Sequence, residues 1–314
     1  MSTIGHQQQK NILSSALKRD NLPHAFIFAG RERIGKKSVA LEFVQNIFCQ
    51  NKNLESGACG KCNTCRAIQQ LSFPDLSVVT PEERGKEIKI EQIEQLINKL
   101  SLKSYNNYYK IGIIDDAHLM NSIAQNALLK TLEEPKGRAI LILITAFPER
   151  LLSTIRSRAQ VLKFFAVPKE EIERYLISLG ANTKEAQEIT FLSSGEIGRA
   201  IDFYKDPSKM KVFQNYLKEI ERLCWADYAE RFQCVKRISD EVENLEGFLQ
   251  IMEIWERFFR REMLYKIFGD VKRLPKYSAE DLLTIIKNLE RTRYLIITTN
   301  INKKTALENF LFNL

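Results

Sequence analysis

The stretch AFIFAGRERIGKKS, residues 25–38, decides how this chain can fold. Its first five residues are apolar and Gly30 follows them at once, which predicts a buried strand that ends in a tight loop. A helical pattern begins near Lys36. Strand, loop and helix in this order are the setting in which the pattern G-x-x-x-x-G-K binds phosphate, so we expect a phosphate-binding loop here.

The loop carries most of the groups that phosphate binding requires. Gly30 and Gly35 let the backbone turn its N–H groups toward phosphate oxygens, the following helix adds the positive end of its dipole, and Lys36 would reach the β- and γ-phosphates. The next position usually holds a Ser or Thr that binds Mg²⁺, but here it is Lys37, and Ser38 lies about 100° further round the helix. We expect phosphate binding to remain and magnesium binding to be impaired; a glycine-rich turn without a ligand is the alternative.

Four later segments are expected to complete a sheet. Short apolar runs at 76–80, 111–115, 140–145 and 160–164 predict strands, and helical patterns lie between them. Strands that alternate with helices form a parallel sheet covered on both faces, whose central strands have no face in water. The expected fold class is therefore α/β.

Beyond residue 168 the strand pattern stops. Residues 169–206 predict small helices, Asp206-Pro207 a linker, and residues 209–314 longer helices with the apolar stripes of a helix-bundle core. We expect three domains: a phosphate-loop domain with a cysteine module at 49–65 in residues 1–167, a small helical domain in 168–207, and an all-α domain in 208–314.

A pair of carboxylates follows the third expected strand. Asp115 stands where nucleotide-hydrolysing enzymes with this loop hold magnesium, and Asp116 occupies the position where many have a longer Glu that activates water. The pair could instead cap a turn. Thr145, at the end of the neighbouring strand, could contact a γ-phosphate or bond its own backbone.

Four of the six cysteines are clustered, at Cys49, Cys59, Cys62 and Cys65. Two overlapping C-x₂-C pairs bring three sulfurs onto a short loop, and Cys49 can complete a tetrahedron. Four thiolates with no open position are typical of a structural Zn²⁺ site, with an iron–sulfur cluster as the alternative. In a reducing compartment such clustering indicates a metal site and not disulfides.

Bulk composition narrows the class of protein. The 314 residues are 44% hydrophobic and 27% charged, which is ordinary for a globular chain of more than one domain. A formal charge of +8 is compatible with a nucleic-acid partner without requiring one. The polar N-terminus lacks the pattern of a signal peptide and no run suits a membrane span, so we expect a cytoplasmic protein.

Several motifs, in order, carry a resemblance to a known family. The chain resembles the delta-prime family of bacterial DNA polymerase III clamp-loader subunits, a branch of the AAA+ group, over residues 24–200. The matching segments are His24–Phe28, the loop Gly30–Lys36, the four clustered cysteines, Asp115–His118, Asn126–Pro135, Thr154–Ala159 and Gly195–Ala200.

The resemblance implies an AAA+ core, a helical lid and a helical collar that holds a ring of subunits together. It implies that Arg158 acts in trans as an arginine finger on the ATP of a neighbouring subunit, although Ala159 replaces the usual Cys of that motif. Arg199 is similar to the lid arginine that senses nucleotide. Lys37 and Asp116 depart from an active motor subunit, as expected of delta-prime.

The implied partners are the gamma/tau motor subunits, the delta subunit and the sliding clamp, with primed DNA reached through the assembled complex. Zn²⁺ is the expected structural cofactor; ATP is a possible ligand, but hydrolysis by this chain and independent enzyme activity are not expected. An autonomous AAA+ ATPase is the first alternative, favoured by Lys36 and opposed by Lys37 and Asp116. A kinase with a zinc lid is the second, but it leaves the Ser-Arg motif unexplained.

Overall fold

The computed structural model describes residues 3–19, 22–53, 57–83, 86–104, 109–134, 137–242, 244–269, 274, 276–299 and 301–314. Two compact units, Met1–Lys205 and Asp206–Leu314, make up the chain. The lid helices expected from the sequence belong to the first unit. Pro135, the last residue of the matching segment Asn126–Pro135, lies outside the described residues.

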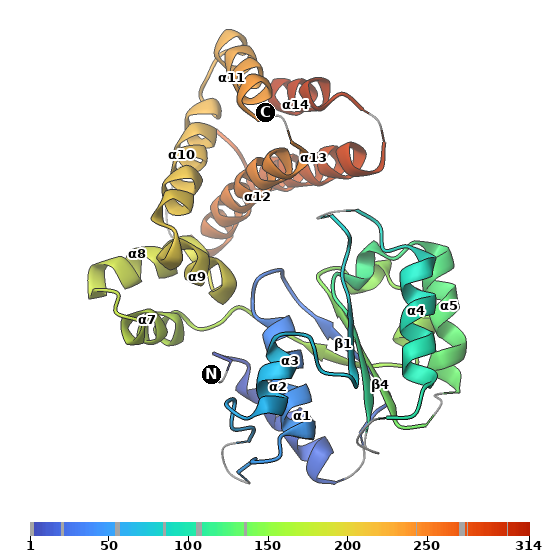
Figure 1. Ribbon diagram of the computed structural model, residues 1–314. Helices are drawn as coiled ribbons and strands as arrows, with labels where there is room; N and C mark the ends of the chain where they lie inside the picture. Colours follow the sequence, from blue (N-terminus) through green and yellow to red (C-terminus); the bar gives the residue numbers. More distant parts are fainter. Residues whose placement is uncertain are drawn as a thin grey trace. The chain divides into compact units, whose positions relative to one another are not determined.

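A parallel sheet of five strands forms the centre of the first unit (Figure 1). The strands follow the order β2-β3-β4-β1-β5, so the first strand of the chain is an inner one. Every neighbouring pair is parallel, and Ala29 pairs with Thr145 at the carboxyl end of the sheet. The strands are β1 Ala25–Ala29, β2 Leu76–Val79, β3 Lys110–Ile114, β4 Ala139–Thr145 and β5 Gln160–Lys163.

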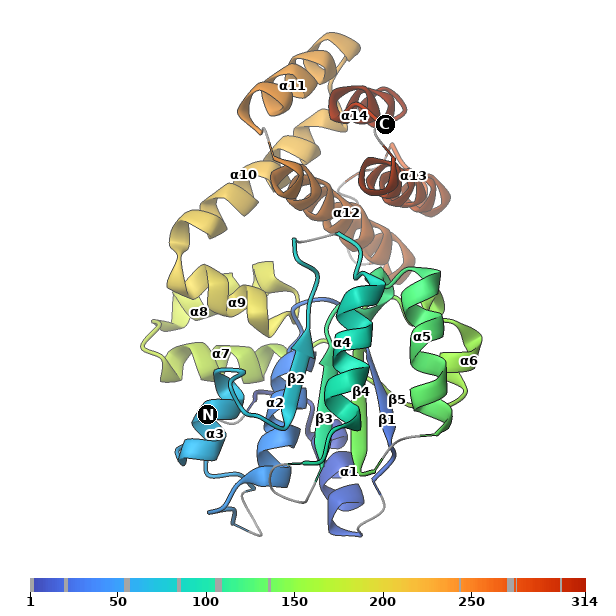
Figure 2. The ribbon, with the colours of Figure 1, turned by 45° about the vertical axis from the view of Figure 1, so that its right-hand side comes forward.

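Helices cover both faces of this sheet (Figures 1 and 2). On one face, Leu13, Phe43 and Ile68 pack in a cluster with Phe26 and Phe28 of β1. The other face has its own cluster from α4, α5 and α6. The helices are α1 Gln7–Lys18, α2 Lys36–Phe48, α3 Asn63–Gln69, α4 Ile90–Ser101, α5 Ser122–Glu133, α6 Ser153–Arg156 and the short 3₁₀ helices η1 Ala117–Leu119 and η2 Pro148–Arg150.

Local sequence explains where these helices begin. Asn121 accepts a hydrogen bond from the Ala124 amide and so caps α5, as its position before an apolar pattern predicts. Gly35 precedes α2 with φ of 103°, a conformation that strongly favours glycine. The start of α2, and with it Lys36 and Lys37, is thereby directed to the carboxyl end of the sheet.

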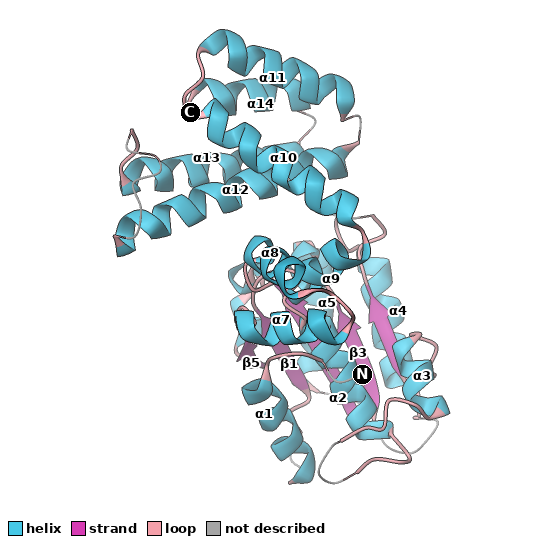
Figure 3. Ribbon diagram, turned by 90° about the vertical axis from the view of Figure 1, so that its left-hand side faces the viewer, coloured by secondary structure: helices cyan, strands magenta, loops and turns pink. Residues whose placement is uncertain are grey.

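Three short helices complete the first unit (Figure 3). They are α7 Lys169–Ser178, α8 Thr183–Ser193 and α9 Ile197–Lys205. Their apolar positions Ile172, Leu176 and Ile189 are buried, as in a small helical layer with its own inner face. The turn before α9 needs Gly195, because a Cβ there would lie 2.6 Å from the Cβ of Ala166.

The second unit is all-α within its described residues (Figure 3). Trp255 is fully buried and stacks on Phe310 with ring centroids 6.0 Å apart, at the middle of one continuous apolar core. Across the described residues no helix has both the length and the apolar character that crossing a bilayer requires. The helices are α10 Pro207–Leu223, α11 Tyr228–Glu241, α12 Leu245–Phe268, α13 Ala279–Thr298 and α14 Lys303–Phe312.

Candidate functional site

The phosphate loop leaves β1 through a tightly packed glycine. The Gly30 amide donates a hydrogen bond to the Thr145 carbonyl at 3.1 Å, which joins the loop to the end of β4. A Cβ on Gly30 would lie 2.5 Å from the Phe164 carbonyl oxygen, so a larger side chain cannot fit without backbone movement. Gly30 is therefore needed for close packing, and Gly35 for a left-handed turn.

Lys36 turns back over the loop. Its ammonium donates to the carbonyl oxygens of Gly30 and Arg31, at 2.5 Å each, and the residue is only 6% exposed. Burial is the main reason that the pKa of Lys36 lies below its usual value, and the nearby Glu32 opposes this shift. An ammonium has three donors, so two carbonyl contacts leave one donor available to a ligand oxygen.

Lys37 contacts Asp115, the carboxylate that the sequence pattern associates with magnesium. Its Nζ lies 3.1 Å from Asp115 Oδ2, and both side chains are partly exposed. Mg²⁺ is bound by oxygen donors in near-octahedral geometry. Because the residue at the hydroxyl position brings an ammonium onto Asp115, the donor set does not fit Mg²⁺.

A cavity of about 450 Å³ lies over the loop, and Lys36, Lys37, Ser38, Asp115 and Asp116 are among its lining residues. The structure thus brings together most of the candidate residues from the sequence. Asp116 has a left-handed backbone, with φ of 51°, where it precedes η1.

Thr145 and Arg199, two of the nucleotide-binding candidates, lie outside the cavity lining. Thr145 is fully buried; its hydroxyl accepts from the Phe147 amide at 3.0 Å and lies 3.3 Å from His118 Nδ1. Arg199 is 5% exposed, and its Nε lies 3.2 Å from the buried Glu196 carboxylate.

Helix α9 is attached to the phosphate loop by contacts that the sequence did not reveal. The Gly198 amide of α9 donates to the Arg33 carbonyl at 2.8 Å, and the Arg33 guanidinium pairs with Asp202 at 2.7 Å. From the N-terminal side, His6 Nε2 lies 2.6 Å from the Ile34 carbonyl oxygen. Arg33 has a φ of 58°, so these contacts hold a backbone conformation that is unusual for a residue with a side chain. Arg33 and Ile34 occupy x positions of the G-x-x-x-x-G-K pattern, where any residue is allowed. The pattern therefore gives no indication of the contacts that they make.

Arg158 lies between α6 and β5 and is not part of the cavity lining. Its Nη2 contacts Glu133 Oε1 at 2.7 Å, and its Nη1 donates to the Thr154 carbonyl at 3.0 Å. Its side chain is 36% exposed and that of Glu133 is 51% exposed. Glu133 belongs to a motif quoted above, yet nothing in the sequence pattern indicated that the two motifs meet.

The four clustered cysteines converge on one point. Their sulfur atoms all lie within 4.8 Å of one another, with Cys49 Sγ 3.6 Å from Cys59 Sγ and 4.0 Å from Cys62 Sγ. A tetrahedral zinc ion with Zn–S bonds of about 2.3 Å places its sulfurs about 3.8 Å apart. The spacing therefore fits a metal such as zinc. One detail corrects the sequence interpretation, which placed the sulfurs on a loop: Cys65 lies in α3 and Cys62 caps that helix.

Backbone amides lower the pKa of the Cys59 and Cys62 thiols, which favours their thiolate forms. Amides of Lys61 and Cys62 lower the pKa of Cys59 to about 6, whereas burial raises the pKa of Cys65. A thiolate is the form that binds metal. Two side chains of α2 hold the module in place: Gln45 Nε2 donates to the Cys65 carbonyl at 2.9 Å, and Asn46 Oδ1 accepts from the Ala58 amide at 2.6 Å.

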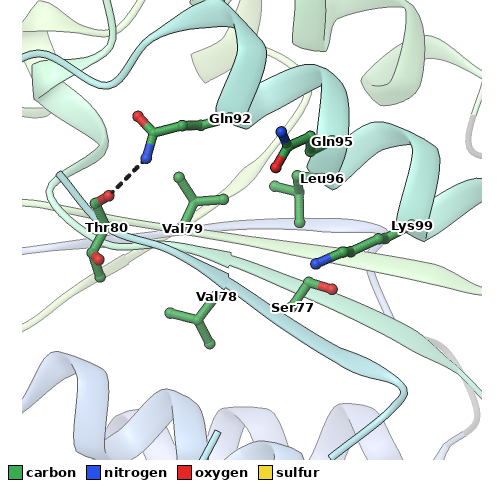
Figure 4. Close-up of a pocket in the computed structure, with 8 residues that line it drawn as sticks. All are labelled: Ser77, Val78, Val79, Thr80, Gln92, Gln95, Leu96 and Lys99. Carbon is green, nitrogen blue, oxygen red and sulfur yellow. Dashed lines mark hydrogen bonds between the residues drawn. The ribbon is translucent and has the colours of Figure 1, made fainter. Parts of the chain in front are cut away.

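A second, smaller cavity lies between β2 and α4 (Figure 4). It measures about 190 Å³ and its lining includes Val78, Leu96 and Lys99. Gln92 Nε2 donates to the Thr80 carbonyl at 3.1 Å across its rim. With one charged group among its lining residues, it lacks the clustered chemistry of the loop cavity.

Comparison with known proteins identifies the family. The family model described as DNA polymerase III, delta subunit matches residues 5–168. The delta' subunit of DNA polymerase III from Bacillus subtilis is 34% identical over 293 residues, which are 88% of this chain and 81% of that protein.

Other relatives match shorter parts of the chain. The Pseudomonas aeruginosa delta' subunit is 38% identical over 135 residues, 43% of this chain and 41% of that protein. The tau subunit of Escherichia coli is 30% identical over 173 residues, 55% of this chain and 26% of that protein. The long match to a delta' subunit and the family model agree with each other. This chain therefore belongs to the delta-prime family of DNA polymerase III subunits.

Proposed function

We propose that the chain is a clamp-loader subunit that does not act as a motor and that lends Arg158 to the ATP site of a neighbouring gamma/tau subunit. The position of Arg158 is the observation that carries this proposal. Its guanidinium is partly exposed, is held by Glu133, and lies outside the lining of the chain's own loop cavity. An arginine in that position suits a ligand on another subunit better than one in its own site.

The loop cavity supports the non-motor part of the proposal. Magnesium neutralises developing charge during phosphoryl transfer, and a carboxylate or amide side chain positions the attacking nucleophile. Here Lys37 contacts Asp115, and Asp116 replaces the longer Glu. Hydrolysis at this site therefore lacks its usual metal ligand and its usual base, which favours a regulatory subunit over the alternative of an autonomous ATPase.

Family membership supplies the context of the proposal. The chain would assemble with the motor subunits and the delta subunit, and the complex would open the sliding clamp and place it on primed DNA. The cysteine module would hold Zn²⁺ as a structural ion, since four sulfur ligands leave no open position for chemistry.

The test is ATP hydrolysis by the reconstituted complex with clamp and primed DNA, comparing wild type, Arg158→Ala and Arg156→Ala. Arg156 is an exposed arginine two residues away and serves as the matched control. An arginine finger contributes about 10³–10⁵-fold at the site it serves. Arg158→Ala should thus abolish the share of hydrolysis from one site, while Arg156→Ala should not. Hydrolysis by the isolated chain, unaffected by Arg158→Ala, would instead establish an autonomous ATPase.

A further inference from the structure

We propose that the cavity over the phosphate loop binds a polyphosphate group without Mg²⁺, and that the Lys37 ammonium takes the place of the metal beside Asp115. The ligand class is a di- or triphosphate moiety, from a nucleotide or from inorganic polyphosphate. The proposal concerns this chain's own cavity and does not depend on Arg158.

The contact between Lys37 and Asp115 excludes a divalent metal ion from this carboxylate. A divalent ion beside Asp115 would have to displace an ammonium that lies 3.1 Å from the carboxylate oxygen. The displaced ammonium would remain on the same turn of α2, so ion and ammonium would repel each other at short range. Ser38, the remaining hydroxyl, lies one position too late on the helix to replace the usual ligand.

The loop keeps the groups that bind an anion, Lys36 and the first amides of α2. Lys36 lines the cavity and is only 6% exposed. Its ammonium has one donor beyond the two that contact carbonyl oxygens. The first amides of α2 are not used by the helix, and a helix of 13 residues presents the positive end of its dipole at Gly35. Lys37 adds a positive charge that an ordinary loop of this type lacks. The lining also includes three carboxylates, which balance its three cations in formal charge, and Lys37 neutralises one of them, Asp115. The helix amides and the remaining Lys36 donor are therefore the groups that would bind phosphate oxygens.

The residues that line the cavity indicate which part of the ligand is recognised. Among the described residues, the cavity lining is made of loop backbone, charged side chains, Ser38, Ile144 and Gly198, with no aromatic ring on which a base could stack. Recognition through the phosphate tail follows from that lining. Because Mg²⁺ binds the same tail in solution and lowers its charge, added Mg²⁺ should weaken binding where in an ordinary site it strengthens it.

The experiment measures binding of ATP and of tripolyphosphate to the full chain by isothermal titration calorimetry, in EDTA and in excess Mg²⁺. Wild type should bind more tightly in EDTA than in excess Mg²⁺. Lys37→Ser restores the magnesium hydroxyl and removes the competing charge, so it should bind ATP at least tenfold more tightly with Mg²⁺ than without. Lys37→Met removes the charge without adding a ligand and should weaken binding in both conditions; circular dichroism would verify its fold.

Several results would overturn the proposal. They are binding by wild type only in the presence of Mg²⁺, no binding of either ligand in EDTA, and an affinity unchanged in Lys36→Ala. Equal affinity for ATP and tripolyphosphate in EDTA would uphold recognition through the phosphate tail. Metal-free binding of ATP with no binding of tripolyphosphate would overturn it, because the base or ribose would then be required. Since the readout is binding by the isolated chain, its failure is separate from a failure of the Arg158 test in the complex.

Discussion

Replacing Glu133 by Gln removes the carboxylate that holds Arg158 while keeping the size of the side chain. The two groups lie 2.7 Å apart and are 51% and 36% exposed. An exposed pair of this kind contributes about 0.2–1 kcal/mol. If Arg158 must leave Glu133 to reach a neighbour's ATP, that contribution opposes the transfer. Glu133→Gln should then raise hydrolysis at the neighbouring site by about 1.4- to 5-fold, at 1.36 kcal/mol per factor of ten.

The assay is steady-state hydrolysis by the reconstituted complex at saturating ATP with primed DNA. Glu134→Gln is the matched control, since the next residue along the chain is an equally charged glutamate. The increase should shrink at high salt, because screening weakens exposed pairs. It should also vanish in an Arg158→Ala background. A fall in rate with Glu133→Gln would refute the reasoning and make Glu133 a residue that positions the arginine, and an increase that survives Arg158→Ala would show that Glu133 acts elsewhere.

Three further outcomes are expected. Cys65→Ser should reduce bound zinc well below the level in wild type, measured by inductively coupled plasma mass spectrometry, because it removes one of four converging sulfurs; unchanged zinc would contradict the assigned ligand set. Gly30→Ala should lower the free energy of unfolding, measured in urea, by about 1–3 kcal/mol through overpacking, because a Cβ there would lie 2.5 Å from the Phe164 carbonyl oxygen; an unchanged free energy of unfolding would contradict this packing role. Burial lowers the pKa of His6 below 6.5, so its contribution to stability is present above that pH and is lost as the pH falls through the folded-state pKa. When the pH is lowered from about 7.5 to 5, the melting temperature of the His6→Gln variant should therefore fall less than that of wild type. An equal fall would exclude His6 as a cause of the acid sensitivity.

The strands were predictable because central parallel strands are buried on both faces. The apolar run at 140–145 corresponds to β4, Ala139–Thr145, whose residues are all buried, and 25–29 is β1. Helix α3 was missed because three cysteines within seven residues obscure any apolar period. Element boundaries elsewhere follow from caps such as Asn121 that can be recognised in the sequence.

Within the site, residue identities were predictable and pairings were not. The replacement of a hydroxyl by Lys37 is visible in the sequence, but its contact with Asp115 depends on the strand order, which places the ends of β1, β4 and β3 side by side. The contact between Glu133 and Arg158 depends in the same way on tertiary structure. The contacts of Gln45 and Asn46 with the cysteine module come from polar side chains on a helix, which follow no period that a sequence could reveal.

The strand order also constrains how the chain can fold during synthesis. β1 is made early, but both of its partners, β4 and β5, are made much later; Ala25 pairs with Leu141 and Phe26 with Gln160. Until β4 has left the ribosome, the apolar β1 has no strand on either side, and such long-range pairing is slow. The cysteine module consists of residues 49–65 and its contacts with α2. A metal ion bound there would order this segment before strands β2 to β5 have been made. A nascent chain would then contain a folded cysteine module next to an unpaired β1. Between the synthesis of β1 and that of β4, this exposed apolar strand would be the segment that a chaperone protects.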